Sequence, residues 1–153
     1  MKQRVVSLSD FGPAENMSLI EADIPTPGNG QIVVKNNAIG LNYLDTYFRS
    51  GLYPWPNNND IKIPGSEGVG YIHAVGSDVL DFKEGDRVSY VTPVGAYAEY
   101  AIINAAHAAK INVEVEDHDV VACTLKGLTT HYLLHLTTKV TSGMTTLVHA
   151  AAG

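Results

Sequence analysis

The stretch IPGSEGVGYIHAVG, residues Ile63–Gly76, gives the strongest indication of the fold of this chain. Its second part, Gly68–Val75, is rich in β-prone residues, and another such run follows at Arg87–Val91. Between the two runs, the tetrad KEGD (83–86) is typical of a tight turn in which Gly85 can adopt a positive φ. These features predict two β-strands separated by a turn.

The rest of the first two-thirds of the chain also has the pattern of β-structure interrupted by turn residues. The segment PTPGNG (25–30) combines rigid prolines with flexible glycines and breaks the chain between two β-regions. We predict strands at Gln3–Leu8, Met17–Ala22 and Gln31–Ile39, and a further strand into which Gly95–Ala101 leads. Together they indicate a small, irregular, barrel-like β-domain.

One short helix and one long loop interrupt this β-region. Leu44 and Phe48 are four residues apart, which predicts a short helix within Asn42–Arg49. The segment Gly51–Pro64 contains three prolines and three consecutive asparagines, and we therefore predict a long loop there.

The character of the sequence changes after residue 110. Apolar positions at helical spacing predict two helices, Asp117–Lys126 and Thr129–Thr138, with Gly127 as the break between them. The final residues, TTLVHAAAG (145–153), predict a buried strand at Thr145–His149 that enters a turn of small residues. Because chain termini usually lie at exposed positions, this ending leads us to expect a truncated chain.

Composition and charge narrow the function classes. The chain has 153 residues, a net charge of −6 and no run of Lys or Arg, so no nucleic-acid partner is expected. No signal peptide or stretch of about 20 apolar residues occurs, which predicts a cytoplasmic protein without membrane insertion. The single cysteine, Cys123, permits neither an internal disulfide nor a multi-cysteine zinc site. Its apolar neighbours predict that Cys123 is a small buried side chain.

Four segments share their order and spacing with one enzyme family. They read AIGLNYLDTYFRSGLYPWP (38–56), IPGSEGVGYIHAVG (63–76), KEGDRVSYVTPVGAYAEY (83–100), and LKGLTTHYLL (125–134) followed by TLVHAAAG (146–153). In this order the chain resembles the zinc-independent quinone oxidoreductases of the zeta-crystallin type, in the medium-chain dehydrogenase/reductase superfamily. The resemblance implies an α+β fold with a GroES-like, partly open β-barrel and short helices in residues 1–125. Residues 126–153 are then a connecting helix and the first strand of a truncated nucleotide-binding Rossmann domain.

The resemblance also bears on metal binding. In zinc-dependent relatives, three protein side chains hold the catalytic metal. The matching positions here are Asn42, Ser66 and Lys126, which offer an amide, a hydroxyl and an ammonium but no thiolate or imidazole. The expected site therefore holds no metal. Asp45 and Glu67 keep their acidic side chains, and we interpret them as remnants around that site.

What replaces the metal, by resemblance, is a pocket for the nicotinamide end of NADPH and a flat quinone. Asn42 offers both a donor and an acceptor, and Lys126 and Thr130 lie four residues apart on one helix face. The implied catalytic residues are Asn42, Tyr47 and Tyr53. The implied cofactor-binding residues are Asn42, Tyr47, Lys126 and Thr130, with Ala151, Ala152 and Gly153 at the start of the glycine-rich phosphate loop.

The same residues have plainer interpretations when the resemblance is set aside. Asn42 is typical of a helix cap, the two tyrosines of half-buried packing, and Lys126 of a solvated helix residue. His131 and His135 have the spacing of a helical zinc site, but no Glu follows the first and no third ligand is near in sequence. We interpret them as part of a polar helix face. His149 is expected to be structural or close to the cofactor phosphates.

Three function hypotheses remain open from the sequence. The first is a homodimeric parent enzyme that transfers reducing equivalents from NADPH to quinones without zinc, with this chain alone inactive. The second is an NADPH-dependent reductase of activated C=C bonds in enones or enoyl thioesters, with Tyr47 or Tyr53 as the proton donor. The third is a non-catalytic GroES-like interaction fragment.

Overall fold

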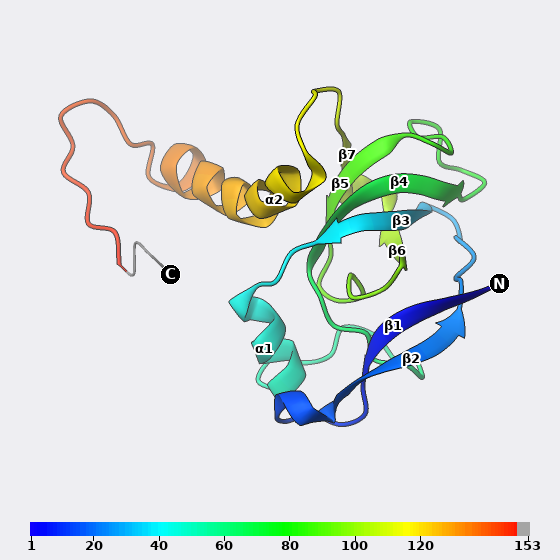
Figure 1. Cartoon of the computed structure of the whole chain (residues 1–153). Coiled ribbons are helices and arrows are strands. Elements are labelled where there is room, and N and C mark those ends of the chain that lie inside the picture. Colours follow the sequence, from blue (N-terminus) through cyan, green and yellow to red (C-terminus); the bar gives the residue numbers. More distant parts are fainter. Residues whose placement is uncertain (150–153) are drawn as a thin grey trace.

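The computed structural model describes residues 1–149, and its strands form two antiparallel sheets (Figure 1). Strand β1 (Lys2–Leu8) pairs with β2 (Met17–Asp23) over its whole length. The larger sheet has the strand order β6-β3-β4-β5-β7. Its members are β3 (Gln31–Ile39), β4 (Glu67–Val75), β5 (Arg87–Val91), β6 (Tyr100–Asn104) and β7 (Ala108–Lys110). The predicted strands up to residue 91 are therefore confirmed, and Gly85 in the predicted turn has a φ of 85°.

Alternate residues of the larger sheet form the main hydrophobic core, as the two-residue period of a strand requires. The cluster contains Ile32, Val34, Ile72, Val88, Tyr90, Ala96, Ala101 and Ile103. A smaller cluster of Val5, Ala22 and Ala98 connects the two-stranded sheet to this body, and Val5 forms an antiparallel bridge with Ala98. The interior is thus shared by segments from both ends of the β-region.

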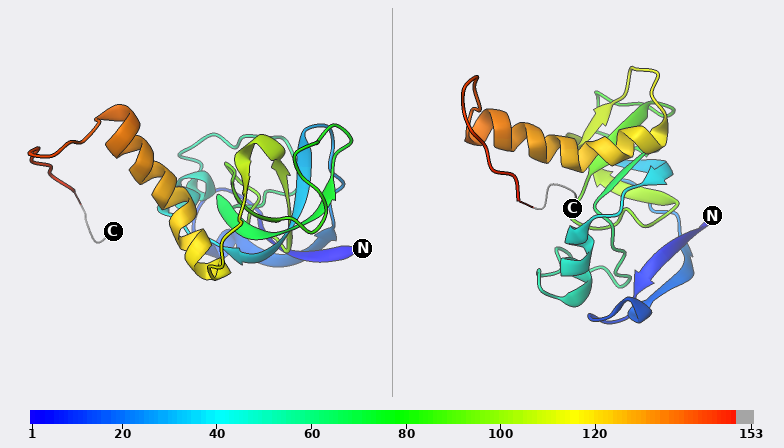
Figure 2. Two further views of the ribbon diagram at one scale, coloured as in Figure 1. Left: turned by 90° about the horizontal axis from the view of Figure 1, so that it is seen from above. Right: turned by 60° about the vertical axis from the view of Figure 1, so that its left-hand side comes forward.

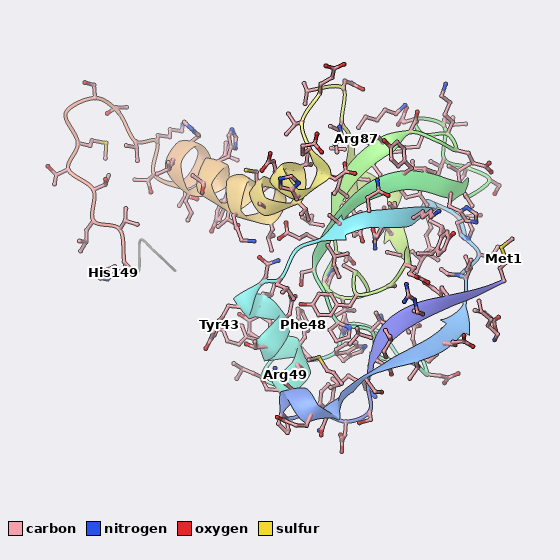
Figure 3. The ribbon with its side chains drawn as sticks, viewed as in Figure 1. Met1, Tyr43, Phe48, Arg49, Arg87 and His149 are labelled. Carbon is pink, nitrogen blue, oxygen red and sulfur yellow. The ribbon has the colours of Figure 1, made fainter. Side chains whose placement is uncertain are left out.

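Helix α1 (Tyr43–Ser50) follows β3 and confirms the predicted short helix. It begins after Asn42, whose backbone N–H donates to Asp45 Oδ2 at 2.9 Å, and it ends at Gly51 with a φ of 78°. Phe48 and Tyr43 lie on opposite sides of the helix, with Phe48 buried toward the β-structure and Tyr43 exposed (Figure 3). The apolar face of this helix therefore fixes its position below the barrel. Two single 3₁₀ turns, Ala14–Asn16 and Ala105–His107, complete the β-region.

Helix α2 (Asp117–His131) runs without a break through Gly127 and continues into a π-helical segment at Tyr132–Thr137. The prediction of two helices separated by Gly127 is therefore wrong. A glycine inside a helix costs only about 1 kcal/mol relative to alanine, which the flanking helix-forming residues offset. Figure 2 shows that the helix extends away from the barrel from its attached N-terminal end.

The start of α2 is held on the barrel by Arg87 of strand β5. Arg87 Nε and Nη2 donate to Asp117 Oδ1 at 2.9 Å and 2.6 Å, and Nη1 donates to the Val113 carbonyl at 3.1 Å. Asp117 Oδ2 also accepts from Asn37 Nδ2 at 2.7 Å. These hydrogen bonds lower the pKa of Asp117, with the Asn37 contact as the largest cause and Arg87 adding to it. In Figure 3, Arg87 lies where the barrel and the start of α2 meet.

Two further predictions about the C-terminal part are wrong. Thr145–His149 is not a strand, because no described segment pairs with it to complete a hydrogen-bonded ladder. Leu147 is 82% exposed, and His149 is exposed at the end of the described chain (Figure 3). Cys123 is exposed rather than buried, because it lies on the side of α2 that faces away from the barrel, whereas Val121 is buried. None of the helices within residues 1–149 has the length and apolar character needed to cross a membrane.

Candidate functional site

The candidate site is built around three side chains from three different elements. Asn42 precedes α1, Glu67 begins β4, and Lys126 lies in the middle of α2. Asn42 Nδ2 donates to Glu67 Oε1 at 2.7 Å, while Lys126 Nζ donates to Asn42 Oδ1 at 2.9 Å and to Glu67 Oε1 at 3.1 Å. The fold therefore brings two predicted site residues, Asn42 and Lys126, into direct contact, with Glu67 bonded to both.

Glu67 is fully buried, and each of its carboxylate oxygens has a hydrogen-bond donor. Oε1 accepts from Asn42 and Lys126, and Oε2 accepts from the Leu125 backbone N–H at 2.8 Å. The exposed fraction of the Glu67 side chain is 0%, whereas that of Lys126 is 56%. A buried carboxylate requires such partners because removing it from water without them is costly. Lys126 thus links a buried charge to the surface.

A second buried network lies next to the first one and joins α1 to the loop before β6. Asp45 Oδ1 accepts from Ser66 Oγ at 2.5 Å, and Asp45 Oδ2 accepts from the Tyr97 hydroxyl at 2.7 Å. Burial is the main cause that raises the pKa of Tyr97, and the hydrogen bond to Asp45 raises it further. The network therefore holds Asp45 in place and engages the Ser66 hydroxyl.

Tyr47 and Tyr53 pack against each other, with ring centroids 5.4 Å apart, and the Tyr53 backbone N–H donates to the Tyr47 carbonyl. Tyr53 also meets Phe48 edge-on, and Phe48 meets Trp55. No hydrogen bond within residues 1–149 joins either phenol to Asn42 or Lys126. The structure therefore places the tyrosines in an aromatic group along α1 and the following loop, and their catalytic role stays a prediction.

The other predicted cofactor-binding residues do not join the hydrogen-bonded group of Asn42, Glu67 and Lys126 in the part of the chain that the structure describes. Thr130 Oγ1 donates to the Lys126 carbonyl at 2.8 Å, so its hydroxyl hydrogen is used within the helix while its oxygen can still accept. Ala151, Ala152 and Gly153 lie outside the described residues. His131 and His135 are exposed neighbours with ring centroids 5.0 Å apart. Within the described part of the chain, no group of three or more His, Cys, Asp or Glu side chains is arranged to hold a metal ion.

Open space lies beside the site. A cavity of about 360 Å³ is bordered by Asn42, Tyr43, Asp45, Arg49 and Tyr97, among others. A larger cavity of about 690 Å³ lies between the Gly51–Pro64 loop and strand β6, away from Lys126. The smaller cavity is the one that borders the polar group at Asn42.

The arrangement leaves hydrogen-bond donors available for a ligand. An ammonium has three hydrogens and a carboxamide nitrogen has two. Lys126 uses two of its hydrogens on Asn42 and Glu67, and Asn42 Nδ2 uses one on Glu67. The remaining hydrogens of the two side chains can bind an oxygen of a phosphate, a ribose hydroxyl or a carbonyl group.

Glu67 has a larger role than the sequence indicates. The sequence predicts only a remnant of a metal site, whereas in the structure Glu67 is the acceptor that joins Asn42 to Lys126. One signal was available: in GSEGVG (65–70) an acidic residue opens a strand of small and apolar residues. A carboxylate at a position that the strand buries must have a partner elsewhere in the fold. The identity of that partner depends on contacts across 59 positions, which no local pattern provides.

Comparison with known proteins places this geometry in a family. Residues 28–113 match the model of the alcohol dehydrogenase GroES-like domain. A probable quinone oxidoreductase of Schizosaccharomyces pombe is 42% identical, over 100% of this chain and 46% of its own length. A 2-haloacrylate reductase of a Burkholderia species is 37% identical, over 93% of this chain and 44% of its own length. A mycobacterial protein solved in complex with NADPH has a TM-score of 0.90 and 38% identity, over 98% of this chain and 46% of that one.

These comparisons confirm the resemblance to quinone oxidoreductases and the expected GroES-like fold. The chain spans less than half the length of each of these proteins.

Proposed function

The chain belongs to the alcohol dehydrogenase GroES-like domain family, and from this we propose that it is part of an enzyme that transfers reducing equivalents from NADPH to quinones without zinc. The observation that carries the proposal is the hydrogen-bonded group of Asn42, Glu67 and Lys126, with donors left for a ligand. The quinone oxidoreductase relative and the NADPH-complexed structure support the substrate and the cofactor.

The absence of catalytic zinc is proposed from the chemistry of these donors. Lys126 places its ammonium group 3.1 Å from Glu67, so the acidic group already has a cation. A zinc ion at this point would be repelled by the ammonium, and neither Asn42 nor Ser66 supplies a thiolate or imidazole. A quinone is reduced readily without a Lewis acid, since it needs orientation and a donor to its oxygen.

The residues of this chain act by binding and orientation. NADPH supplies the reducing equivalents when it is bound. Lys126 and Asn42 would donate hydrogen bonds to the nicotinamide ribose and diphosphate region of the bound cofactor, and Tyr47 and Tyr53 would offer aromatic faces to a flat ring.

The proposal extends to the organisation of the whole protein. We assign residues 1–125 to the GroES-like catalytic domain and residues 126–153 to the connecting helix and the segment that would become the first strand of a Rossmann domain when the whole protein supplies neighbouring strands. Leu128, Tyr132 and Leu136 are exposed on the second half of the helical region, which suits packing against a further domain. The whole protein is proposed to be a cytoplasmic homodimer. The 153-residue chain alone is proposed to be inactive, because its relatives are about twice as long.

A second candidate is reduction of an activated C=C bond in an enone or enoyl thioester. The likeness to a 2-haloacrylate reductase favours it, since a haloacrylate carries such a bond. Tyr47 or Tyr53 is then the proton donor. A purely non-catalytic interaction module is disfavoured because such a module does not need a buried carboxylate bonded to an exposed ammonium.

Steady-state assays of the full-length protein test these alternatives. NADPH oxidation is measured with quinones of several sizes and, separately, with enones and enoyl thioesters. The proposal requires higher kcat/KM with quinones and less than about 0.1 zinc per chain by elemental analysis after dialysis. Preference for the C=C substrates supports the second candidate. One zinc per chain contradicts the zinc-independent mechanism.

A further inference from the structure

Glu67 is not one of the expected cofactor-binding residues, yet it is bonded to two of them. Its side chain is completely buried at the start of β4, yet all of its hydrogen-bond donors belong to segments that border the proposed site. Asn42 and Lys126 are two of them, and the third is the backbone of Leu125, the residue before Lys126. Burial of a charge at this position costs stability that an apolar residue of similar volume would not cost.

The hydrogen bonds to Glu67 determine how the Asn42 amide is oriented. Because a carboxylate only accepts hydrogen bonds, the Asn42 group that faces Glu67 must be the NH₂. Because the Lys126 ammonium only donates, the group that faces Lys126 must be the carbonyl oxygen. Both conditions select the same orientation of the amide. Reversal of this amide would bring its NH₂ group against the Lys126 ammonium and its oxygen against the Glu67 carboxylate, and neither pair could form a hydrogen bond.

Gly40 provides room for the Glu67 carboxylate. A Cβ atom added to Gly40 would overlap the Glu67 side chain, including Oε1, and the backbone N–H of Gly40 donates to the Glu67 carbonyl at 3.2 Å. The φ of Gly40 is not positive, so the requirement here is for space and not for backbone freedom. Gly40 therefore allows the carboxylate to reach Asn42 and Lys126.

From this geometry we propose that Glu67 is a positioning residue, which fixes the Asn42 amide and the Lys126 ammonium in the orientation that binds NADPH. The inference rests on the proposed function. Glu67 does not touch the cofactor; it acts through the two side chains that do. One hydrogen of each side chain is left for the ligand, because Glu67 accepts one hydrogen from each and Asn42 Oδ1 accepts another from Lys126.

Glu67→Gln in the full-length protein tests the role without changing side-chain size. A Gln side chain has one donor end and one acceptor end, whereas both ends of Glu67 accept. At least one of its three donors must therefore face an NH₂ group. We expect the Kd for NADPH to rise about ten- to hundred-fold, with a smaller change in the KM for the quinone.

Gly40→Ala provides a second variant, which displaces the carboxylate but removes no polar group. We expect its Kd for NADPH to rise in the same direction. Tyr90→Phe is the matched control for lost stability, because the buried Tyr90 hydroxyl donates to Asn36 Oδ1 at 2.9 Å and lies outside the site. Its melting temperature is expected to fall, and its Kd for NADPH to stay as in the unmodified protein.

The double variant Glu67→Gln/Lys126→Met distinguishes positioning from a separate structural effect. If Glu67 acts through Lys126, the fold-change in the Kd for NADPH of the double variant is smaller than the product of the fold-changes of the two single variants. The inference is overturned if Glu67→Gln and Gly40→Ala lower the melting temperature as Tyr90→Phe does and leave the Kd for NADPH unchanged. An unmodified protein that neither binds NADPH nor reduces a quinone overturns the proposed function itself, and with it the role of Glu67.

Discussion

Removal of the Lys126 charge is the perturbation for which the structure gives the clearest expectation. Lys126→Met keeps most of the aliphatic stem and deletes the ammonium that lies 3.1 Å from Glu67 Oε1. Glu67 then stays buried with hydrogen bonds from Asn42 and Leu125 but with no cation within the site. The variant therefore leaves a buried carboxylate without its cation, and it also removes the hydrogen bond from Lys126 to Asn42 Oδ1.

The expected loss lies between two limits. Breaking a fully buried ion pair from one side costs about 3–5 kcal/mol, and breaking an exposed pair costs at most about 1 kcal/mol. Here one partner is fully buried and the other is 56% exposed, so solvent already screens part of the attraction. With two neutral donors remaining on Glu67, we expect a loss of about 1–3 kcal/mol in the free energy of unfolding.

The chain contains a matched control. Lys2 Nζ lies 3.0 Å from Asp23 Oδ1, and the Lys2 side chain is 62% exposed, but its partner Asp23 is 77% exposed. Lys2→Met thus removes the same group, at nearly the same distance, from an exposed partner. Equilibrium urea unfolding followed by circular dichroism gives the free energies of both variants. Equal losses for Lys126→Met and Lys2→Met would refute the argument from the burial of Glu67.

Three other predictions address the site, the clamp at the start of α2, and the helix itself. Asn42→Ala in the full-length protein is expected to lower kcat/KM about ten- to hundred-fold, whereas a mere helix cap would lower the melting temperature and leave the kinetics unchanged. The pKa of Asp117 is lowered in the folded state by Asn37 and Arg87. The stability that the ionised Asp117 contributes is therefore present above about pH 4 and is lost as the pH falls through the lowered pKa. Asp117→Asn is expected to flatten the pH dependence of the urea midpoint in this acid range. Gly127→Ala is expected to raise the free energy of unfolding by about 0.5–1 kcal/mol, since a Cβ there meets no other atom within 4 Å; an unchanged or lower urea midpoint would contradict this.

The β-region was predictable because its signals are local. Strand β3 occupies Gln31–Ile39 as predicted, since alternation within a strand and the flanking turn residues are both visible in the sequence. The C-terminal errors have the opposite cause. Thr145–His149 has the composition of a buried strand, but a strand forms only beside a partner, and the described residues supply none.

The sequence indicated two residues of the candidate site but not the hydrogen bonds that join them. The resemblance pointed to Asn42 and Lys126, and the structure joins them by a hydrogen bond across 84 positions of sequence. The central role of Glu67 was missed because it depends on which side chains meet after folding. Tyr47 and Tyr53, which the resemblance implies as catalytic residues, pack their rings against each other along α1 and the following loop, and their catalytic role stays a prediction.

The position of Lys126 depends on a contact that lies well away from it. Arg87 holds Asp117 at the first turn of α2, and Lys126 lies nine residues further, which is about 13 Å along a helix. A tilt of about 5° around that anchor would therefore move Lys126 by about 1 Å, enough to break its hydrogen bond to Asn42. Since a displacement of about 1 Å in a catalytic site can reduce the rate about a hundred-fold, the contact between Arg87 and Asp117 would help to set the geometry of the proposed site.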